Sequence, residues 1–143
     1  MTTSNISHFY VGCFLVTPDN SILGQQRDDK PDIDNPNRVG SFGGTIEHGE
    51  SMISAITREL REETNLNLAE SNFEQYFQDT AWRKLSSEWE QRYFYFARIT
   101  EQQYANLQVY EGQGWVAITS SNDPLLIDLW RQPYQELANK LAL

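Results

Sequence analysis

The chain has 143 residues, of which 39% are hydrophobic and 13% aromatic, and this fits one folded domain with one core over residues 1–143. Its formal net charge is −9, which argues against nucleic acid or an anionic membrane as a partner, because both would repel it. An anionic substrate would need a cation to bridge it to this protein.

The single cysteine, Cys13, excludes an internal disulfide and fits a reducing compartment, so we expect a cytoplasmic protein. Cys13 lies in an apolar run, residues 9–16, where a buried structural thiol is expected. That run is too short to span a bilayer and has no basic flank before it, so it predicts neither a signal peptide nor an anchor.

The first half of the chain predicts strands followed by a helix. Residues 9–17 and 21–27 read as two strands joined by a Pro-Asp-Asn-Ser turn, which predicts a hairpin. A polar loop with two prolines follows over residues 28–37, and residues 41–47 form a short strand or loop. Ser51 is a good cap for a helix that runs to about Thr64.

The second half predicts more strands and a terminal helix. Residues 73–82 and 90–99 read as adjacent antiparallel strands, and residues 114–118 as a short strand. The final helix, over residues 133–143, gathers four apolar residues on one side: Tyr134, Leu137, Ala138 and Leu141. These elements predict an α+β layered domain with a mixed sheet.

The helix at residues 51–63 has an unusual charge pattern. At about 100° per residue, Ile53, Ile56 and Leu60 form the stripe that faces the core. The positions expected opposite the core are Ser54, Thr57 and Arg61. Three glutamates instead share an arc of roughly 100° that borders the core, namely Glu59, Glu62 and Glu63.

The position of these glutamates favours a metal site over a solvated acidic face. A solvated face would lie opposite the core and carry Lys or Arg nearby, yet only Arg58 is close. Like charges at a partly dry edge cost free energy unless they are neutralised. Hard oxygen ligands select Mg²⁺, Mn²⁺ or Ca²⁺ over zinc.

The stretch from Gly44 to Leu66 closely resembles the Nudix box, G-x5-E-x7-R-E-U-x-E-E-x-G-U, where U is aliphatic. Eight of the nine specified positions match, and the match includes Glu50 and the run Arg58-Glu59-Leu60. The chain length, the hairpin before the box and the strands after it resemble a Nudix domain as well. The resemblance implies an α/β/α sandwich with a central mixed sheet.

Two positions depart from the family pattern. Asn65 stands where the family has the glycine that ends the helix, and we expect it to adopt the left-handed conformation that Asn tolerates next best. Phe42 stands where the family usually has Pro before two glycines. This second change affects the rigidity of the loop and the placement of the Gly43 carbonyl.

The resemblance implies hydrolysis of a nucleoside diphosphate linked to another group, with water attacking phosphorus near Mg²⁺ or Mn²⁺. It implies that Glu62 and Glu63 ligate the metal, that Glu59 is a further ligand or the base, and that the Gly43 carbonyl is an extra ligand. Gly44, Glu50 and Arg58 would support the site.

Further residues are implied outside the box. Glu111, in the Glu-Gly-Gln-Gly-Trp stretch, resembles a carboxylate that related enzymes supply as ligand or base, although an exposed turn would look the same. Glu101 is a weaker substitute. Arg27 and Arg38 match places where related enzymes bind phosphate, or they are simple surface arginines. Candidate shelves for a base are Phe9, Tyr10, Trp82, Trp89 and Tyr93.

The leading hypothesis is a pyrophosphohydrolase that converts a nucleoside triphosphate to the monophosphate and pyrophosphate. The alternative is a hydrolase of nucleotide sugars or other nucleoside diphosphate derivatives. A non-catalytic ligand sensor usually loses box glutamates, which this chain keeps. An isopentenyl diphosphate isomerase would be longer with a suitably placed cysteine, and an RNA-end hydrolase would be basic.

The expected partner is therefore a small nucleotide, with no nucleic acid and no membrane, and a homodimer is common in the family. Substrate choice is expected to lie in residues 28–37 and 79–90.

Overall fold

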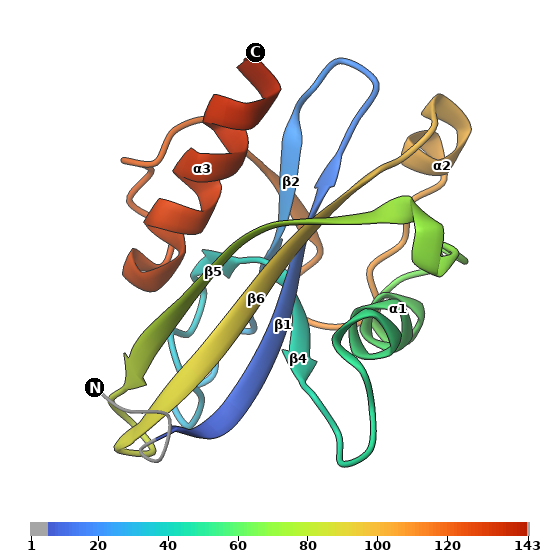
Figure 1. The fold of residues 1–143 in the computed structure, drawn as a ribbon. Helices are drawn as coiled ribbons and strands as arrows, with labels where there is room; N and C mark the ends of the chain where they lie inside the picture. Colours follow the sequence, from blue (N-terminus) through green and yellow to red (C-terminus); the bar gives the residue numbers. More distant parts are fainter. Residues whose placement is uncertain (1–5, 143) are drawn as a thin grey trace.

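The computed structural model describes residues 6–142, so the ends of the predicted domain, residues 1–5 and 143, lie outside the described part. Within it, seven strands form one mixed sheet (Figure 1). They are β1 (Ile6–Val16), β2 (Ile22–Gln26), β3 (Val39–Gly40), β4 (Phe42–Thr45), β5 (Phe73–Arg83), β6 (Glu88–Arg98) and β7 (Trp115–Ile118). The helices are α1 (Met52–Glu63), α2 (Glu101–Ala105) and α3 (Arg131–Ala142), with 3₁₀ turns η2 (Glu70–Asn72) and η3 (Asp128–Trp130).

The predicted hairpins are present. β1 pairs antiparallel with β2, and β5 pairs antiparallel with β6 along most of its length. The sheet is mixed because β1 also runs parallel to β6. The sequence did not predict β3, whose two residues pair with β2 only after the long loop 28–37 has folded back.

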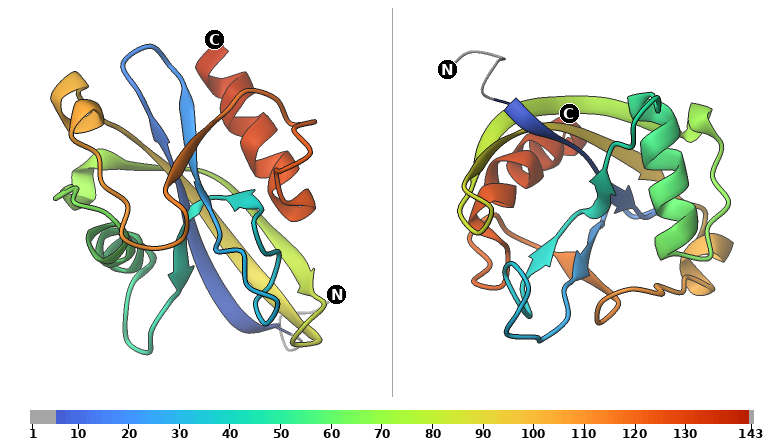
Figure 2. Two further views of the ribbon diagram at one scale, coloured as in Figure 1. Left: turned by 180° about the vertical axis from the view of Figure 1, so that it is seen from behind. Right: turned by 90° about the horizontal axis from the view of Figure 1, so that it is seen from below.

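The sheet lies between α1 and α3, as the predicted sandwich requires (Figures 1 and 2). Successive side chains of a strand point to opposite faces, so β1 serves both cores. Cys13 and Leu15 belong to the cluster under α1. Phe14 and Val16 belong to the cluster under α3. Tyr134 and Leu137 of α3 are buried against that second face, as predicted.

Helix α1 begins and ends where the sequence predicts, but its wheel needs one correction. The Ser51 hydroxyl caps the helix by accepting a hydrogen bond from Ser54 N–H at 3.2 Å. Ile56 and Leu60 are fully buried and Ile53 is partly buried against the same core. Thr57 was expected opposite the core, yet it is buried, because its hydroxyl donates to the Ile53 carbonyl at 2.6 Å and leaves only its methyl to pack.

The expectation for Asn65 was wrong. The described residues with positive φ other than glycine are Asn20, Asn35, Asn37 and Ser87, so Asn65 is not left-handed. Instead, its side-chain amide donates to the Asn106 carbonyl at 2.8 Å, and its amide oxygen accepts from Gln108 N–H at 2.9 Å. Asn65 therefore ties the end of α1 to the segment after α2, which glycine could not do.

β1 shares one of its edges between two partners. Residues Tyr10–Cys13 pair with β4, whereas Leu15 and Val16 pair with β2. The Gly43–Gly44 pair therefore lies on a short strand whose other edge is open toward α1. No helix within residues 6–142 is both long enough and apolar enough to cross a membrane.

Candidate active site

Glu63, in the last turn of α1, is the most deeply buried carboxyl group of the box. Its residue is 2% exposed, and it accepts a hydrogen bond from Gly43 N–H at 2.9 Å. Burial, together with the nearby Glu59 and Glu111 charges, raises the pKa of Glu63 to about 9. The single N–H from Gly43 opposes this shift but does not cancel it. Within the described part of the chain, no positively charged side chain is among the groups that affect the Glu63 pKa, so nothing in the fold favours its ionised form strongly enough to offset burial.

Glu59 lies one turn earlier, against the backbone of Gly44. A Cβ added at Gly44 would lie 2.7 Å from the Glu59 carboxyl carbon, so a side chain there would displace this carboxylate. Burial raises the pKa of Glu59, and Arg58 opposes the shift. The Glu59 charge is, after burial, the largest cause that raises the pKa of Glu63. The two predicted ligands therefore lie close enough for each to affect the titration of the other.

Arg58 is the brace that the sequence predicts. Its Nε and Nη2 donate to the Glu50 carboxylate at 2.7 and 2.9 Å, and Nη2 also donates to the Thr45 carbonyl at 3.2 Å. Its Nη1 donates to Glu59 at 3.0 Å and lies 3.3 Å from Glu62. One guanidinium thus fixes the loop before the helix and two of the three glutamates, and Glu62 remains largely exposed.

The loop that carries Glu111 lies beside the end of α1. Tyr110 N–H donates to the Glu63 carbonyl at 2.7 Å, and Gln25 donates to the Glu111 carbonyl at 3.1 Å. The Glu111 side chain is exposed, yet its charge raises the pKa values of both Glu59 and Glu63. Glu111 is therefore on the same side of the molecule as the box glutamates, whereas Glu101 starts the surface helix α2.

The box residues suit a divalent metal chemically, although they are not yet gathered around one point. Within residues 6–142, no three His, Cys, Asp or Glu side chains are arranged so that they could hold an ion as they stand. Glu59 and Glu62 instead contact Arg58, and Glu63 contacts Gly43. Carboxylate oxygens are the ligands that Mg²⁺ and Mn²⁺ prefer, so the chemistry of these side chains fits such an ion.

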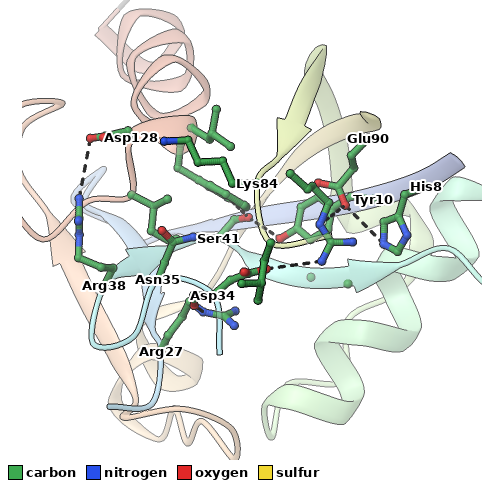
Figure 3. Close-up of a pocket in the computed structure, with 18 of the residues that line it drawn as sticks. His8, Tyr10, Arg27, Asp34, Asn35, Arg38, Ser41, Lys84, Glu90 and Asp128 are labelled. Carbon is green, nitrogen blue, oxygen red and sulfur yellow. Dashed lines mark hydrogen bonds and ion pairs between the residues drawn. The ribbon is translucent and has the colours of Figure 1, made fainter. Parts of the chain in front are cut away.

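A pocket of about 640 Å³ opens beside Gly43 and Gly44, on the sheet face opposite α1 (Figure 3). Its floor carries side chains from β1 and β6, including His8, Tyr10 and Glu90. Its walls come from the 28–37 loop, the hairpin between β5 and β6, and residues Ile127–Trp130. The two loops predicted to choose the substrate therefore both border this pocket.

The structure brings some predicted pocket residues together and excludes others. Arg27 and Arg38 both line the pocket, but Arg27 Nε donates to the Asp34 carbonyl at 2.7 Å and Arg38 Nη2 donates to the Leu126 carbonyl at 2.8 Å. Tyr10 and Trp82 line the pocket. The other proposed shelves, Phe9, Trp89 and Tyr93, are not among its lining residues.

Sequence reasoning did not name Ser41 or Trp130 among the lining residues, and it included Glu90 only as the end of the 79–90 segment. The Trp130 indole N–H donates to the Ser41 hydroxyl at 2.7 Å, and Ser41 is 3.0 Å from the Tyr10 hydroxyl. A signal for Glu90 was present, because period-2 alternation places it on the same strand face as buried Phe94 and Phe96.

Comparison with known proteins agrees with this geometry. The family model for the NUDIX domain matches residues 7–134. No curated protein sequence matches the chain. The fold is similar to that of the MutT protein from Methanosarcina mazei Go1, with a TM-score of 0.75 and 14% identity over 97% of this chain and 98% of that one.

Two further solved structures share the fold. The E. coli dihydroneopterin triphosphate pyrophosphohydrolase has a TM-score of 0.67 and 17% identity over 94% of this chain and 99% of that one. A bifunctional NMN adenylyltransferase/ADP ribose pyrophosphatase from Francisella tularensis, complexed with AMP and a Mn ion, has a TM-score of 0.69 and 17% identity. That match covers 97% of this chain but only 43% of the longer enzyme. The family match, the box and the sandwich together confirm the sequence-based assignment: the chain belongs to the NUDIX domain family, as a hydrolase of diphosphate bonds.

Proposed function

We propose that this hydrolase is a metal-dependent pyrophosphohydrolase that cleaves a nucleoside triphosphate to the monophosphate and pyrophosphate. The main support is the placement of two half-buried to buried carboxyl groups with raised pKa values, Glu59 and Glu63, beside Gly44 and Gly43 at the open side of the box helix. The adjoining pocket has a size suited to a nucleotide and carries two arginines.

The proposed metal ligands are Glu59, Glu62, Glu63, the Gly43 carbonyl and Glu111, with Mg²⁺ as the ion and Mn²⁺ as a substitute. A bound divalent cation supplies neutralisation of the pyrophosphate charge and helps to position water. The Mn ion in the Francisella tularensis structure is in keeping with this choice.

The chain's own residues would prepare the reaction in three ways. Arg58 holds Glu50 and Glu59 so that the loop and helix keep a fixed separation. Glu59 or Glu111 would accept the proton of the attacking water. Arg27 and Arg38 would contact phosphate, for which their remaining N–H groups must turn into the pocket.

A second candidate substrate class is a nucleoside diphosphate derivative such as ADP-ribose or a nucleotide sugar. It is favoured by one of the similar folds, which belongs to an ADP ribose pyrophosphatase. The two classes differ in the leaving group and therefore in which product appears.

The test is a product screen with Mg²⁺ over nucleoside triphosphates, nucleotide sugars, dinucleoside polyphosphates and ADP-ribose. We expect pyrophosphate and a nucleoside monophosphate from a triphosphate, and no product in EDTA. Glu63→Gln should abolish turnover, whereas Glu136→Gln, an exposed change on α3 across the sheet, should leave it intact. Release of single phosphate, or turnover only with ADP-ribose or nucleotide sugars, would contradict the proposal.

A further inference from the structure

Glu90 is a buried carboxylate that the proposed chemistry does not use. It lies in β6, its side chain is 7% exposed, and it lines the floor of the pocket. In the register of the sheet it is flanked by His8 on β1 and by Ala81 on β5, so these side chains form one row. The pocket reaches Glu90 and His8 of this row but not Ala81.

The contacts of Glu90 within the described residues leave its acceptor capacity unfilled. His8 Nε2 is 3.5 Å away and Arg83 Nε is 3.8 Å away, which are ion-pair rather than good hydrogen-bond distances. His8 Nε2 is moreover engaged at 2.9 Å with the Thr45 hydroxyl. An ionised carboxylate has about four acceptor sites, so donors for Glu90 must come from water or from a ligand.

Burial raises the pKa of Glu90, and Arg83 and Arg92 oppose the shift. A buried acceptor without donors costs free energy, and ligand N–H groups that reach it would recover that cost. The group is thus prepared for a ligand that presents donors without acceptors beside them.

The walls next to Glu90 suit a flat ring. Tyr10 and Trp130 meet edge to face, with ring centroids 5.8 Å apart, and both are held by the Ser41 hydroxyl. The Arg92 guanidinium lies 4.8 Å from the centre of the Trp130 ring and is locked by two bonds to Asp79. This wall is therefore rigid, and an aromatic ring can pack against it without ordering new side chains.

Among nucleobases, the pattern of donors decides which edge fits a carboxylate. Guanine carries a ring N–H beside an exocyclic NH₂, which gives two parallel donors for a bidentate acceptor. Adenine and cytosine place an acceptor beside their NH₂, and uracil places its single N–H between two carbonyl groups. Pterins share the donor pair of guanine, because both contain a 2-amino-4-oxopyrimidine ring.

We propose that Glu90 is the specificity-determining residue of this pocket and accepts the paired N–H donors of a 2-amino-4-oxopyrimidine edge, as carried by guanine and pterins. The inference rests on the proposed function only in taking the substrate to carry phosphates. Base recognition itself can be measured without hydrolysis.

The test is calorimetric binding of GMP, IMP, AMP and UMP to the whole chain in EDTA. IMP differs from GMP only by lacking the 2-amino group, so GMP should bind about 10-fold or more tightly, the worth of one hydrogen bond to a charged group. Glu90→Gln should remove most of this preference. Glu88→Gln is the matched control, because Glu88 contacts the same His8 and Arg83 but does not line the pocket.

Three results would overturn the assignment. The first is equal affinity of the wild-type chain for GMP and IMP. The second is an equal loss of affinity for all four nucleotides in Glu90→Gln that is not seen with 2′,3′-dideoxynucleotides. This result would mean that Glu90 binds the sugar hydroxyl groups. The third is an equal loss accompanied by a lower melting temperature, which would mean that Glu90 only supports the fold. Glu90→Asp, which retains the carboxylate, should keep part of the GMP preference if the assignment is right.

Hydrolysis assays then show whether the bound ring is guanine or a pterin. They also distinguish the role of Glu90 from the proposed function. A higher kcat/KM for GTP than for a pterin triphosphate identifies guanine as the ligand, and the reverse identifies a pterin. Selective GMP binding without triphosphate hydrolysis would refute the proposed function and leave Glu90's role standing. Hydrolysis of all triphosphates at equal rates, with no GMP preference in binding, would support the proposed function and refute the role of Glu90.

Discussion

Glu63 and Gly43 are joined by a hydrogen bond of 2.9 Å that links the last turn of α1 to the open strand β4. The glycine has a φ of +144°, and a Cβ at this position would overlap the Val11 carbonyl. Only glycine brings the chain so close to β1 and still aims its N–H at Glu63. The strand and helix thus fix one oxygen of a buried carboxyl group before any ligand arrives.

The stability of the metal-free protein should fall as pH rises, because the pKa of Glu63 is raised from 4.5 to about 9 by burial, Glu59 and Glu111. Between these two values the folded chain binds a proton that the unfolded chain has released, so the free energy of unfolding decreases with pH. Denaturant melts in EDTA near pH 5, 7 and 9 would measure this slope. Glu63→Gln should flatten it and Glu136→Gln should not. Equal slopes for wild type and Glu63→Gln would mean that Glu63 is already ionised in the fold.

Mg²⁺ or Mn²⁺ should stabilise the protein if the proposed ligands are right, because the ion would neutralise the charges of Glu59, Glu62 and Glu63 and would bind only the folded arrangement. At a concentration 100 times its Kd, the gain is about 2.7 kcal/mol. Thermal melts with EDTA, with the divalent salt and with NaCl of matched ionic strength would measure it. The Glu63→Gln variant should melt slightly higher than wild type in EDTA and gain less from the ion. A shift no larger than that of NaCl would favour a simple acidic surface.

The sequence was sufficient for α1 and its surroundings because local signals agree there. Ser51, the apolar stripe and the glutamates lie within a few turns of one another, and each reports the same helix. Thr57 and Asn65 were misjudged for a shared reason. The Thr57 hydroxyl bonds to the Ile53 carbonyl, and the Asn65 side chain bonds to the 106–108 segment. A helical wheel or a capping preference does not include such specific hydrogen bonds.

The pocket could not be predicted in the same way. Glu90, Ser41 and Trp130 come from segments that are about 40 to 90 residues apart in the chain. They meet through the pairing of β4 with β1, the parallel pairing of β1 with β6 and the turn η3. The two-residue strand β3 likewise depends on its partner β2 and on the Leu126 bridge rather than on its own composition. Long-range pairing therefore builds the pocket that is proposed to select the substrate.

Glu111→Gln should lower turnover by roughly 10²-fold while leaving the fold intact, which is the usual effect of removing a positioned acid–base group. The change in stability should be small because the Glu111 side chain is exposed. The loop keeps its hydrogen bond from Tyr110 N–H to the Glu63 carbonyl and the one from the Gln25 side-chain amide to the carbonyl of residue 111. Steady-state kinetics and a thermal melt would be compared with wild type. An unchanged rate would shift the role to Glu59 or Glu101.

Gly44 and Gly49 should respond to alanine for opposite reasons, and the pair separates geometry at the site from backbone strain. Gly44 needs no left-handed backbone, but its Cβ would lie 2.7 Å from the Glu59 carboxyl carbon. Gly44→Ala should therefore keep most stability, since Glu59 can turn away, and lower turnover by roughly 10²-fold, the scale of a displaced catalytic group. Gly49 has a φ of +80° with open space around its Cβ, so Gly49→Ala should cost about 1 kcal/mol through strain and preserve turnover. Urea denaturation and kcat measured on both variants decide the matter. If Gly44→Ala loses stability but keeps full activity, the Glu59 carboxylate does not act from the position it occupies against Gly44.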